Sequence, residues 1–144
     1  MQIIEVMTRQ VQTCQTNDPV EKAARIMESS DVGSVPVVDQ DGRLTGIMTD
    51  RDIVLRGVAK NKDLRMTTCG ELMTGEVKCC EPHTEIHEAA NMLAQHQIRR
   101  LPVVDNQGRL VGICAIGDLA VRDIYINESG EALSRISRGA GTLQ

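Results

Sequence analysis

The chain has 144 residues, a net charge of −4 and a single aromatic residue. The acidic balance argues against nucleic acid as a partner, and the scarcity of aromatic rings leaves no platforms for base stacking. No apolar run approaches the ~20 residues of a membrane span, and the N-terminus lacks a signal-peptide pattern. We therefore expect a cytoplasmic protein that contacts no membrane, with its five cysteines as thiols.

One stretch of sequence occurs twice, 66 positions apart. Residues 35–39 read VPVVD and residues 101–105 read LPVVD. The two copies align without a gap over residues 5–56 and 71–122. Self-similarity at a fixed period indicates that one supersecondary unit was used twice. We therefore predict two half-size units that share one interface.

The first repeat shows the pattern of strand, helix, strand, strand and helix. Asp18 is expected to cap the first helix and Pro19 to take its first helical position. The helix carries one apolar stripe, and two β-branched runs flank a hairpin turn. The predicted elements are a turn over 4–8, a strand over 11–14, a helix ending near Ser30, strands over 34–38 and 44–49, and a helix over 50–57.

The second repeat has the same order after a polar linker over 58–68, and Thr84 is expected to cap its first helix. We predict an α+β fold of two βαββα repeats. The further predicted elements are a turn over 71–74, strands over 77–80, 101–104 and 110–115, and helices over 118–124 and 131–137. The predicted boundaries are 1–66 for the first motif with its linker, 67–126 for the second motif, and 127–144 for a C-terminal helix and flexible tail.

The two aligned blocks resemble a tandem pair of cystathionine-β-synthase (CBS) motifs. The resemblance covers residues 1–124 and is strongest to small bacterial CBS-pair proteins without a catalytic or transporter domain. It implies two repeats packed about a pseudo-twofold axis, with two clefts that bind an adenosine nucleotide or a related adenosyl ligand in many members. It also implies that two such modules form a homodimer.

The resemblance points to Gly46-x-x-Thr49-x-x-Asp52 as a ribose–phosphate motif. A carboxylate in the first turn of a helix can accept both hydroxyls of a ribose, and Thr49 with nearby backbone N–H groups can reach a phosphate. Arg51 adds a positive charge. The alternative is structural, with Asp52 as a helix cap and Thr49 as a β-former.

The second copy keeps Asp118 but has Ala115 in place of the threonine. Losing that hydroxyl removes roughly 0.5–1.5 kcal/mol of hydrogen bonding, so we expect the cleft built on Thr49 and Asp52 to be the main one. Arg99 and Arg100 either meet phosphates or form a solvated pair. The expected ligand-binding residues are Ser34, Pro36, Thr49, Arg51, Asp52, Arg99, Arg100, Pro102 and Asp118.

Other chemistry is less favoured. Cys79, Cys80, His83 and His87 have a zinc-like spacing. However, His83 precedes the expected cap Thr84 and so lies outside the helix, and Cys80 aligns with Cys14 as an ordinary buried residue. No nucleophile with an adjacent base is evident, so we expect no enzyme and no resident cofactor. We predict a regulatory module that senses AMP, ADP, ATP or a related adenosyl ligand and signals through a partner protein. The alternatives are a ligand-free interaction protein and a metal- or redox-linked stress protein.

Overall fold

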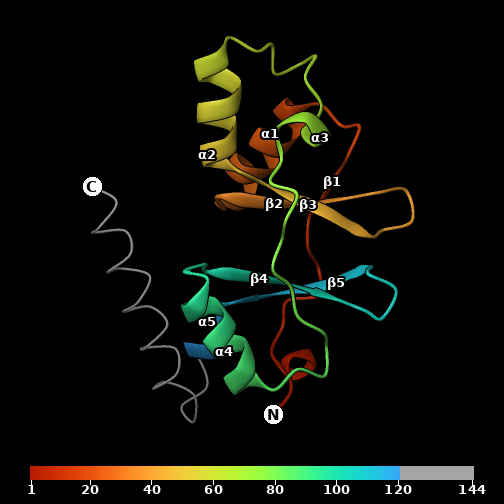
Figure 1. Cartoon of the computed structure of the whole chain (residues 1–144), viewed down its shortest axis with the longest axis vertical. Coiled ribbons are helices and arrows are strands. Elements are labelled where there is room, and N and C mark those ends of the chain that lie inside the picture. Colours follow the sequence, from red (N-terminus) through yellow and green to blue (C-terminus); the bar gives the residue numbers. More distant parts are fainter. Residues whose placement is uncertain (121–144) are drawn as a thin grey trace. The chain divides into compact units, whose positions relative to one another are not determined.

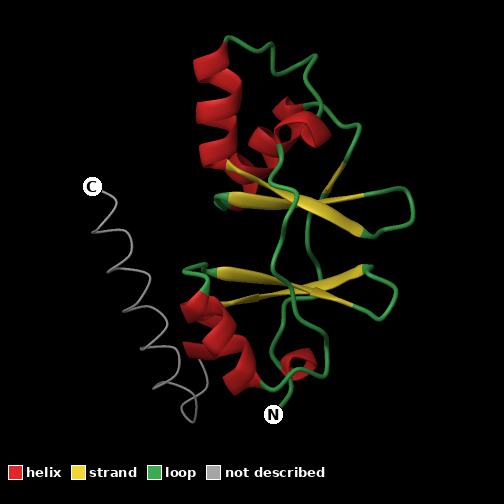
Figure 2. Cartoon of the chain, in the orientation of Figure 1, coloured by secondary structure: helices red, strands yellow, loops and turns green. Residues whose placement is uncertain are grey.

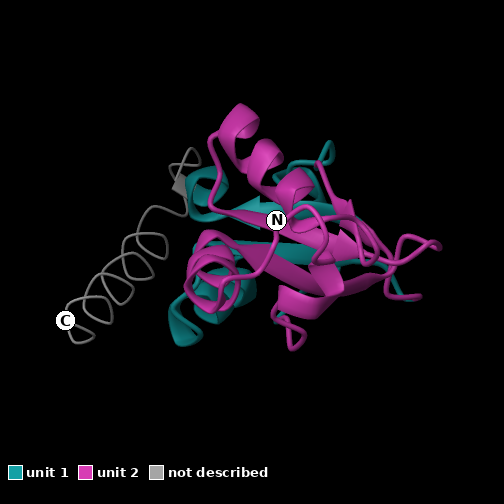
Figure 3. Ribbon diagram, turned by 90° about the horizontal axis from the view of Figure 1, so that it is seen from above, with its two compact units in different colours: residues 1–11, 78–106, 111–144 teal, residues 12–77, 107–110 magenta. Residues whose placement is uncertain are grey.

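The computed structural model describes residues 1–120 and combines helices with strands (Figures 1 and 2). The α+β fold class is therefore confirmed. The chain divides into two compact units, shown in different colours in Figure 3. Within the described residues, unit 1 consists of 1–11, 78–106 and 111–120, and unit 2 consists of 12–77 and 107–110.

Two predicted features lie outside the described residues. These are the helix over 131–137 with its tail and the end of the helix predicted over 118–124. Among residues 1–120, no helix is long and apolar enough to span a membrane.

Unit 2 contains a three-stranded sheet of β1 (Cys14–Gln15), β2 (Ser34–Val38) and β3 (Leu44–Thr49). β1 runs parallel to β2, and β2 runs antiparallel to β3. Both strands of the predicted hairpin are confirmed, whereas the strand predicted over 11–14 begins only at Cys14. The hairpin turn places Gly42 at φ +83°, a left-handed conformation that glycine adopts without steric cost.

Two helices cover one face of this sheet, α1 (Val20–Ser30) and α3 (Cys69–Leu72) (Figure 1). The predicted apolar stripe of α1 is confirmed, because Val20 and Ala23 are fully buried. The core of unit 2 consists of Cys14, Val20, Ala23, Val35, Val37, Met48, Ile53, Cys69 and Leu72.

The helix predicted over 50–57 follows β3, but its geometry changes along its length. It begins as α2 (Asp50–Asp52), widens into the π-helix η2 (Ile53–Gly57) and ends as the 3-10 helix η3 (Val58–Lys60). Gly57 lies at the point where the helix narrows again. A Cβ atom there would lie 2.9 Å from Leu64 Cδ2, so the absence of a side chain permits this close packing.

Unit 1 contains η1 (Ile3–Glu5), α4 (Ile86–Gln95), β4 (Arg100–Val104), β5 (Leu110–Ala115) and α5 (Ile116–Ala120). The helices α4 and α5 lie on one face of the β4–β5 pair (Figure 1). The strand predicted over 77–80 is wrong, because this segment forms only a bridge between Cys80 and Val103. The predicted stripe of α4 is confirmed, and its buried residues are Ile86, Ala89, Ala90 and Leu93.

The predicted cap of α1 is wrong. Pro19 is the N-cap residue, and the Asp18 carboxylate instead accepts a hydrogen bond from the Gln15 N–H at 2.7 Å. The first N–H of the helix is satisfied from a distant segment, since Val20 N–H donates to the Thr67 carbonyl at 2.9 Å. A free N–H at a helix start needs an acceptor but not necessarily a side chain.

The predicted cap of α4 is wrong for the same reason. Glu85 is the N-cap residue, and the Thr84 hydroxyl accepts from the Glu81 N–H at 3.1 Å. The Ile86 N–H donates to the Met1 carbonyl at 3.1 Å. Each helix start is therefore closed by a segment from elsewhere in the same unit.

The two repeats exchange their opening turns. Thr74, from the turn that opens the second repeat, pairs with Ile47 of β3 through two hydrogen bonds of 2.9 Å. Thr8, from the turn that opens the first repeat, pairs in the same way with Ile113 of β5. The compact units therefore have different boundaries from the sequence repeats.

A glycine permits each of these crossings. A Cβ atom on Gly46 would lie 2.6 Å from Met73 Sδ and 2.7 Å from the Thr74 carbonyl oxygen. Gly112 stands at the equivalent place in unit 1, where a Cβ atom would lie 2.7 Å from Met7 Sδ. These distances are shorter than a side chain tolerates, so both positions require glycine for the turn to approach.

Candidate functional site

The candidate site of unit 2 lies where β3 ends and α2 begins. Thr49 is the N-cap residue, and its hydroxyl oxygen accepts from the Asp52 N–H at 3.0 Å. In return, Asp52 Oδ2 accepts from the Thr49 N–H at 3.0 Å. This reciprocal capping box holds the Asp52 carboxylate in one orientation.

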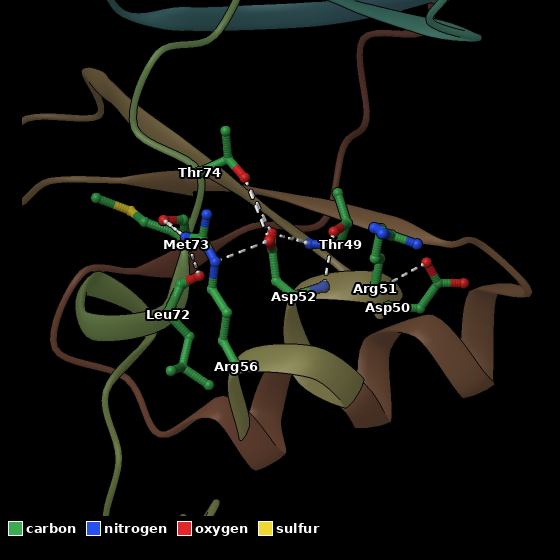
Figure 4. Close-up of polar contacts among 8 residues, drawn as sticks. All are labelled: Thr49, Asp50, Arg51, Asp52, Arg56, Leu72, Met73 and Thr74. Atoms are coloured by element: carbon green, nitrogen blue, oxygen red, sulfur yellow. Dashed lines mark hydrogen bonds and ion pairs between the residues drawn. The ribbon is translucent and has the colours of Figure 1, made fainter. Parts of the chain in front are cut away.

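Two further residues contact the Asp52 carboxylate (Figure 4). The Thr74 hydroxyl lies 3.2 Å from Oδ2 and 3.3 Å from Oδ1. The Arg56 Nε atom lies 3.8 Å from Oδ1. Asp52 is only 7 % exposed, so these contacts offset the cost of burying its polar oxygens.

Arg56 also fixes the segment that carries Thr74. Its Nη1 atom donates to the carbonyl oxygens of Leu72 and Met73, both at 3.2 Å. The end of α3 and the turn after it are thus fastened to the helix that carries Asp52. This arrangement supplies a carboxylate that accepts a hydroxyl hydrogen bond, the type of contact that a ribose hydroxyl can make.

The other residues predicted for the first repeat lie around this point. Ser34 of β2 pairs with Thr49 of β3, and the buried Pro36 pairs with Ile47. Arg51 lies on α2 with an exposed side chain. The structure thus brings Ser34 close to the capping box, keeps Arg51 on the same helical turn and places Pro36 two residues further along β2.

Unit 1 has a simpler version of the same site. Asp118 Oδ2 accepts from the Ala115 N–H at 2.8 Å, but Ala115 has no hydroxyl to return the bond. Arg99 is exposed, and its carbonyl accepts from the Ile116 N–H at 3.0 Å. Pro102 lies in β4 and is buried.

Arg100 has a more buried environment than Arg99. Burial lowers the pKa of the Arg100 guanidinium, and the nearby Asp118 carboxylate opposes that shift. The cation and the carboxylate therefore belong to one local group in unit 1. That Arg100 meets Asp52 across a cleft stays a prediction from the sequence.

The metal-like cluster of the second repeat does not converge. Cys80 is buried, and burial raises its pKa to about 12, which disfavours the thiolate that zinc needs. His83 lies outside α4, as the sequence predicts, and its Nδ1 atom is 2.9 Å from Gln2 Oε1. Within residues 1–120, no group of three or more His, Cys, Asp or Glu side chains could hold a metal ion.

Sequence reasoning missed Thr74 and Arg56 as site residues. Thr74 had a signal, because it repeats Thr8 after a methionine at the same register. Arg56 had a local signal for its ion pair, because it lies four residues after Asp52 on the same helical run. Its bonds to the Leu72 and Met73 carbonyls depend on where α3 ends. A surface hollow of about 430 Å³ lies elsewhere in unit 2, at the start of α1, and is lined by Pro19, Glu21, Lys22, Arg25 and Arg65.

Comparisons with known proteins identify similar sequences and structures. The sequence profile of the CBS domain matches twice, over residues 3–58 and 69–124. The CBS domain-containing protein YhcV of Bacillus subtilis is 45 % identical over 133 residues, which cover 92 % of this chain and 93 % of that protein.

Two solved structures carry adenosyl ligands. CBSX2 in complex with AMP has a TM-score of 0.74 and 25 % identity, covering 88 % of this chain and 98 % of its own. The CBS domain pair of MJ0100, in complex with 5-methylthioadenosine and S-adenosyl-L-methionine, has a TM-score of 0.72 and 28 % identity, covering 84 % and 94 %.

Proposed function

Because the chain belongs to the CBS domain family, we propose that it is a regulatory module that binds an adenine nucleotide on the Thr49–Asp52 site. The observation that carries the proposal is the oriented, nearly buried Asp52 carboxylate, which already accepts a hydroxyl hydrogen bond from Thr74. A ribose hydroxyl of the ligand makes the same type of bond and takes the place of Thr74. Two solved CBS structures that bind adenosyl ligands support the ligand class.

The phosphate end of the ligand is proposed to lie toward Thr49 and Arg51. Thr49 ends a strand at the start of a helical run, where backbone N–H groups favour an anion. Arg51 adds an exposed guanidinium on the same turn, and guanidinium groups pair well with phosphate oxygens. AMP, ADP or ATP is therefore the proposed ligand, bound reversibly and with no resident cofactor.

The proposed role is regulatory and non-enzymatic, in the cytoplasm, with output through a partner protein. A ligand can signal only if it binds two states of the protein with different affinity. Displacement of Thr74 by the ligand provides such a difference, because Thr74 belongs to the turn that pairs with β3. A partner that contacts this turn would read whether the ligand is bound.

Homodimerisation is part of the proposal and has an observation of its own. Val54, Leu55 and Val58 are 55 %, 44 % and 59 % exposed along one helical run. Exposed apolar residues gathered on one element are typical of an interaction surface. Val58→Glu should shift the chain toward the monomer in sedimentation velocity, whereas Ala59→Glu, on the same run, should not.

A second function has one observation in its favour. Asp52 is already bonded to Thr49, Thr74 and Arg56, so its role as a cap needs no ligand. The chain would then be an interaction protein that keeps the fold of its family without the ligand.

Thermal unfolding in the presence of AMP, ADP, ATP and S-adenosylmethionine distinguishes the two functions. A ligand at about 100 times its Kd stabilises the folded state by ~2.7 kcal/mol, so an upward shift of the midpoint is expected with at least one nucleotide. An unchanged midpoint with all four, at concentrations far above physiological levels, would favour the interaction protein.

A further inference from the structure

We propose that Cys14 and Cys69 form a reversible dithiol–disulfide pair, a redox modification site in the interior of unit 2. Both are free thiols with no exposed surface, and both belong to the same core cluster. The proposal is independent of the adenine nucleotide.

The backbone around the two thiols fixes their proximity. Cys14 begins β1 and Cys69 begins α3. The Cys69 N–H donates to the Asp18 carbonyl at 2.8 Å, and the Gly70 N–H donates to the Thr16 carbonyl at 2.9 Å. Two backbone bonds therefore hold the first turn of α3 against the segment that directly follows Cys14.

In both repeats, the residues equivalent to Cys14 and Cys69 lie in the same core cluster. With the spacing of 66 residues, Cys14 corresponds to Cys80 and Cys69 corresponds to Ile3. Ile3 and Cys80 also share one core cluster, in unit 1. The residues at the positions of Cys14 and Cys69 thus share a core in both units, but only unit 2 has sulfur at both positions.

The ionisation of the two thiols is linked. A hydrogen bond between the two side chains lowers the pKa of Cys14 and raises that of Cys69. The Cys69 thiol also donates to the Pro19 carbonyl at 3.8 Å. Burial and the Asp18 carboxylate oppose the lowering of the Cys14 pKa, and the Lys22 ammonium adds to it. Because its pKa is the lowered one, Cys14 is proposed as the sulfur that attacks an oxidant.

Hydrogen peroxide is the proposed oxidant. The Cys14 thiolate attacks one peroxide oxygen, which gives a sulfenic acid and releases hydroxide. The Cys69 sulfur then attacks the Cys14 sulfur, forming the S–S bond, and the sulfenic oxygen leaves as water with the Cys69 proton. In total, two thiols lose two electrons and two protons, and one peroxide is reduced to two waters.

The buried position of the two cysteines determines how fast they are oxidised and how the disulfide affects stability. Both sulfurs are covered, so peroxide must reach them through a local opening, and α3 is only four residues long. Once formed, the disulfide closes a loop between positions 55 residues apart and restricts the unfolded chain. Oxidation should therefore be slow, reversible by a thiol reductant and stabilising.

Peptide mapping of the full chain after peroxide treatment tests the proposal. Trypsin releases residues 10–22 and 66–78, each with a single cysteine. Without reductant, we expect these two peptides to be linked within one chain, with the loss of two hydrogen atoms, and to separate in dithiothreitol. The thermal midpoint of the oxidised protein should be higher and should return to its original value on reduction.

Two matched variants and one internal reference sharpen the result. Cys69→Ala should abolish the linked peptides, whereas Cys80→Ala, the residue equivalent to Cys14 in the other repeat, should leave them. Cys79 is partly exposed and reports that peroxide has acted. The proposal is overturned if Cys79 oxidises while peptides 10–22 and 66–78 stay unlinked, or if they link only between chains.

Discussion

The two units contain the same carboxylate in two different settings. In each, an aspartate three residues into a helical turn accepts the N–H of the residue that ends the strand, at 3.0 Å for Asp52 and 2.8 Å for Asp118. Thr49 returns this bond in unit 2 and Ala115 cannot. Within residues 1–120, Thr74 bonds Asp52, but its counterpart Thr8 makes no such bond with Asp118. The two units thus share the backbone arrangement around the aspartate and differ in the side chains that contact it.

The largest expected effect on stability tests the close approach of each opening turn to a strand, which both units share. Gly46→Ala places a methyl group 2.7 Å from the Thr74 carbonyl oxygen, and the overpacking should cost about 2–3 kcal/mol. Gly112→Ala, where the Thr8 carbonyl oxygen lies at 2.9 Å, should cost a similar amount. The free energy of unfolding from denaturant titration measures both.

Gly75→Ala is the control, because nothing lies within 4 Å of an added Cβ there. If Gly46→Ala were as mild as Gly75→Ala, the exchange of opening turns between the repeats would be contradicted.

The next effect tests the difference between the two copies. Thr49→Ala should cost about 1 kcal/mol by removing the capping hydroxyl. Ala115→Thr should stabilise unit 1 by a similar amount, because the new hydroxyl can accept from the Asp118 N–H as Thr49 does from Asp52. Equal and opposite shifts of the unfolding midpoint are expected. A loss of stability in Ala115→Thr would show that the backbone at this strand end differs between the two units, and not only the side chain.

A smaller effect is expected at low pH. A hydrogen bond from the Gln15 N–H, together with Lys22, holds the pKa of Asp18 below its ordinary value of 3.8. Since the folded-state pKa is the lower one, this stabilisation is complete above the ordinary value and is lost as the pH falls through the folded-state pKa. Unit 1 has Thr84 at the equivalent position, bonded to Glu81 in the same way.

Asp18→Thr should therefore keep the hydrogen bond and remove this part of the acid sensitivity. Unfolding of both proteins at about pH 7 and about pH 3 measures the difference. The variant should lose less stability than the original on acidification, and an equal loss would contradict the assignment.

Local patterns in the sequence predicted much of the fold. The apolar stripes of α1 and α4 and the hairpins closed by Gly42 and Gly108 depend on neighbouring residues, and all four agree with the structure. The caps failed at Asp18 and Thr84, because the helix starts are satisfied by carbonyls from distant segments. Capping rules consider only residues near the helix start, so they cannot predict an acceptor from a distant segment.

The candidate site was predictable only in part. The resemblance to the CBS family gave Thr49 and Asp52, and the structure shows that they bond to each other. Thr74 joins them only because the opening turn of the second repeat pairs with β3 of the first, whereas Arg56 lies four residues after Asp52 on the same helical run. The π-helical turn over Ile53–Gly57, which follows directly from Asp52, also escaped prediction, since its wider turn has no distinct period in so short a segment.

Isothermal titration of AMP into the original chain, Asp52→Asn and Asp118→Asn tests the central claim most directly. Loss of a hydrogen bond to a charged group costs about 1.5–3 kcal/mol, so Asp52→Asn should bind AMP at least about tenfold more weakly. Asp118→Asn should bind nearly as well as the original chain. Equal losses in the two variants, or undiminished binding by Asp52→Asn, would contradict the assignment of the site to unit 2.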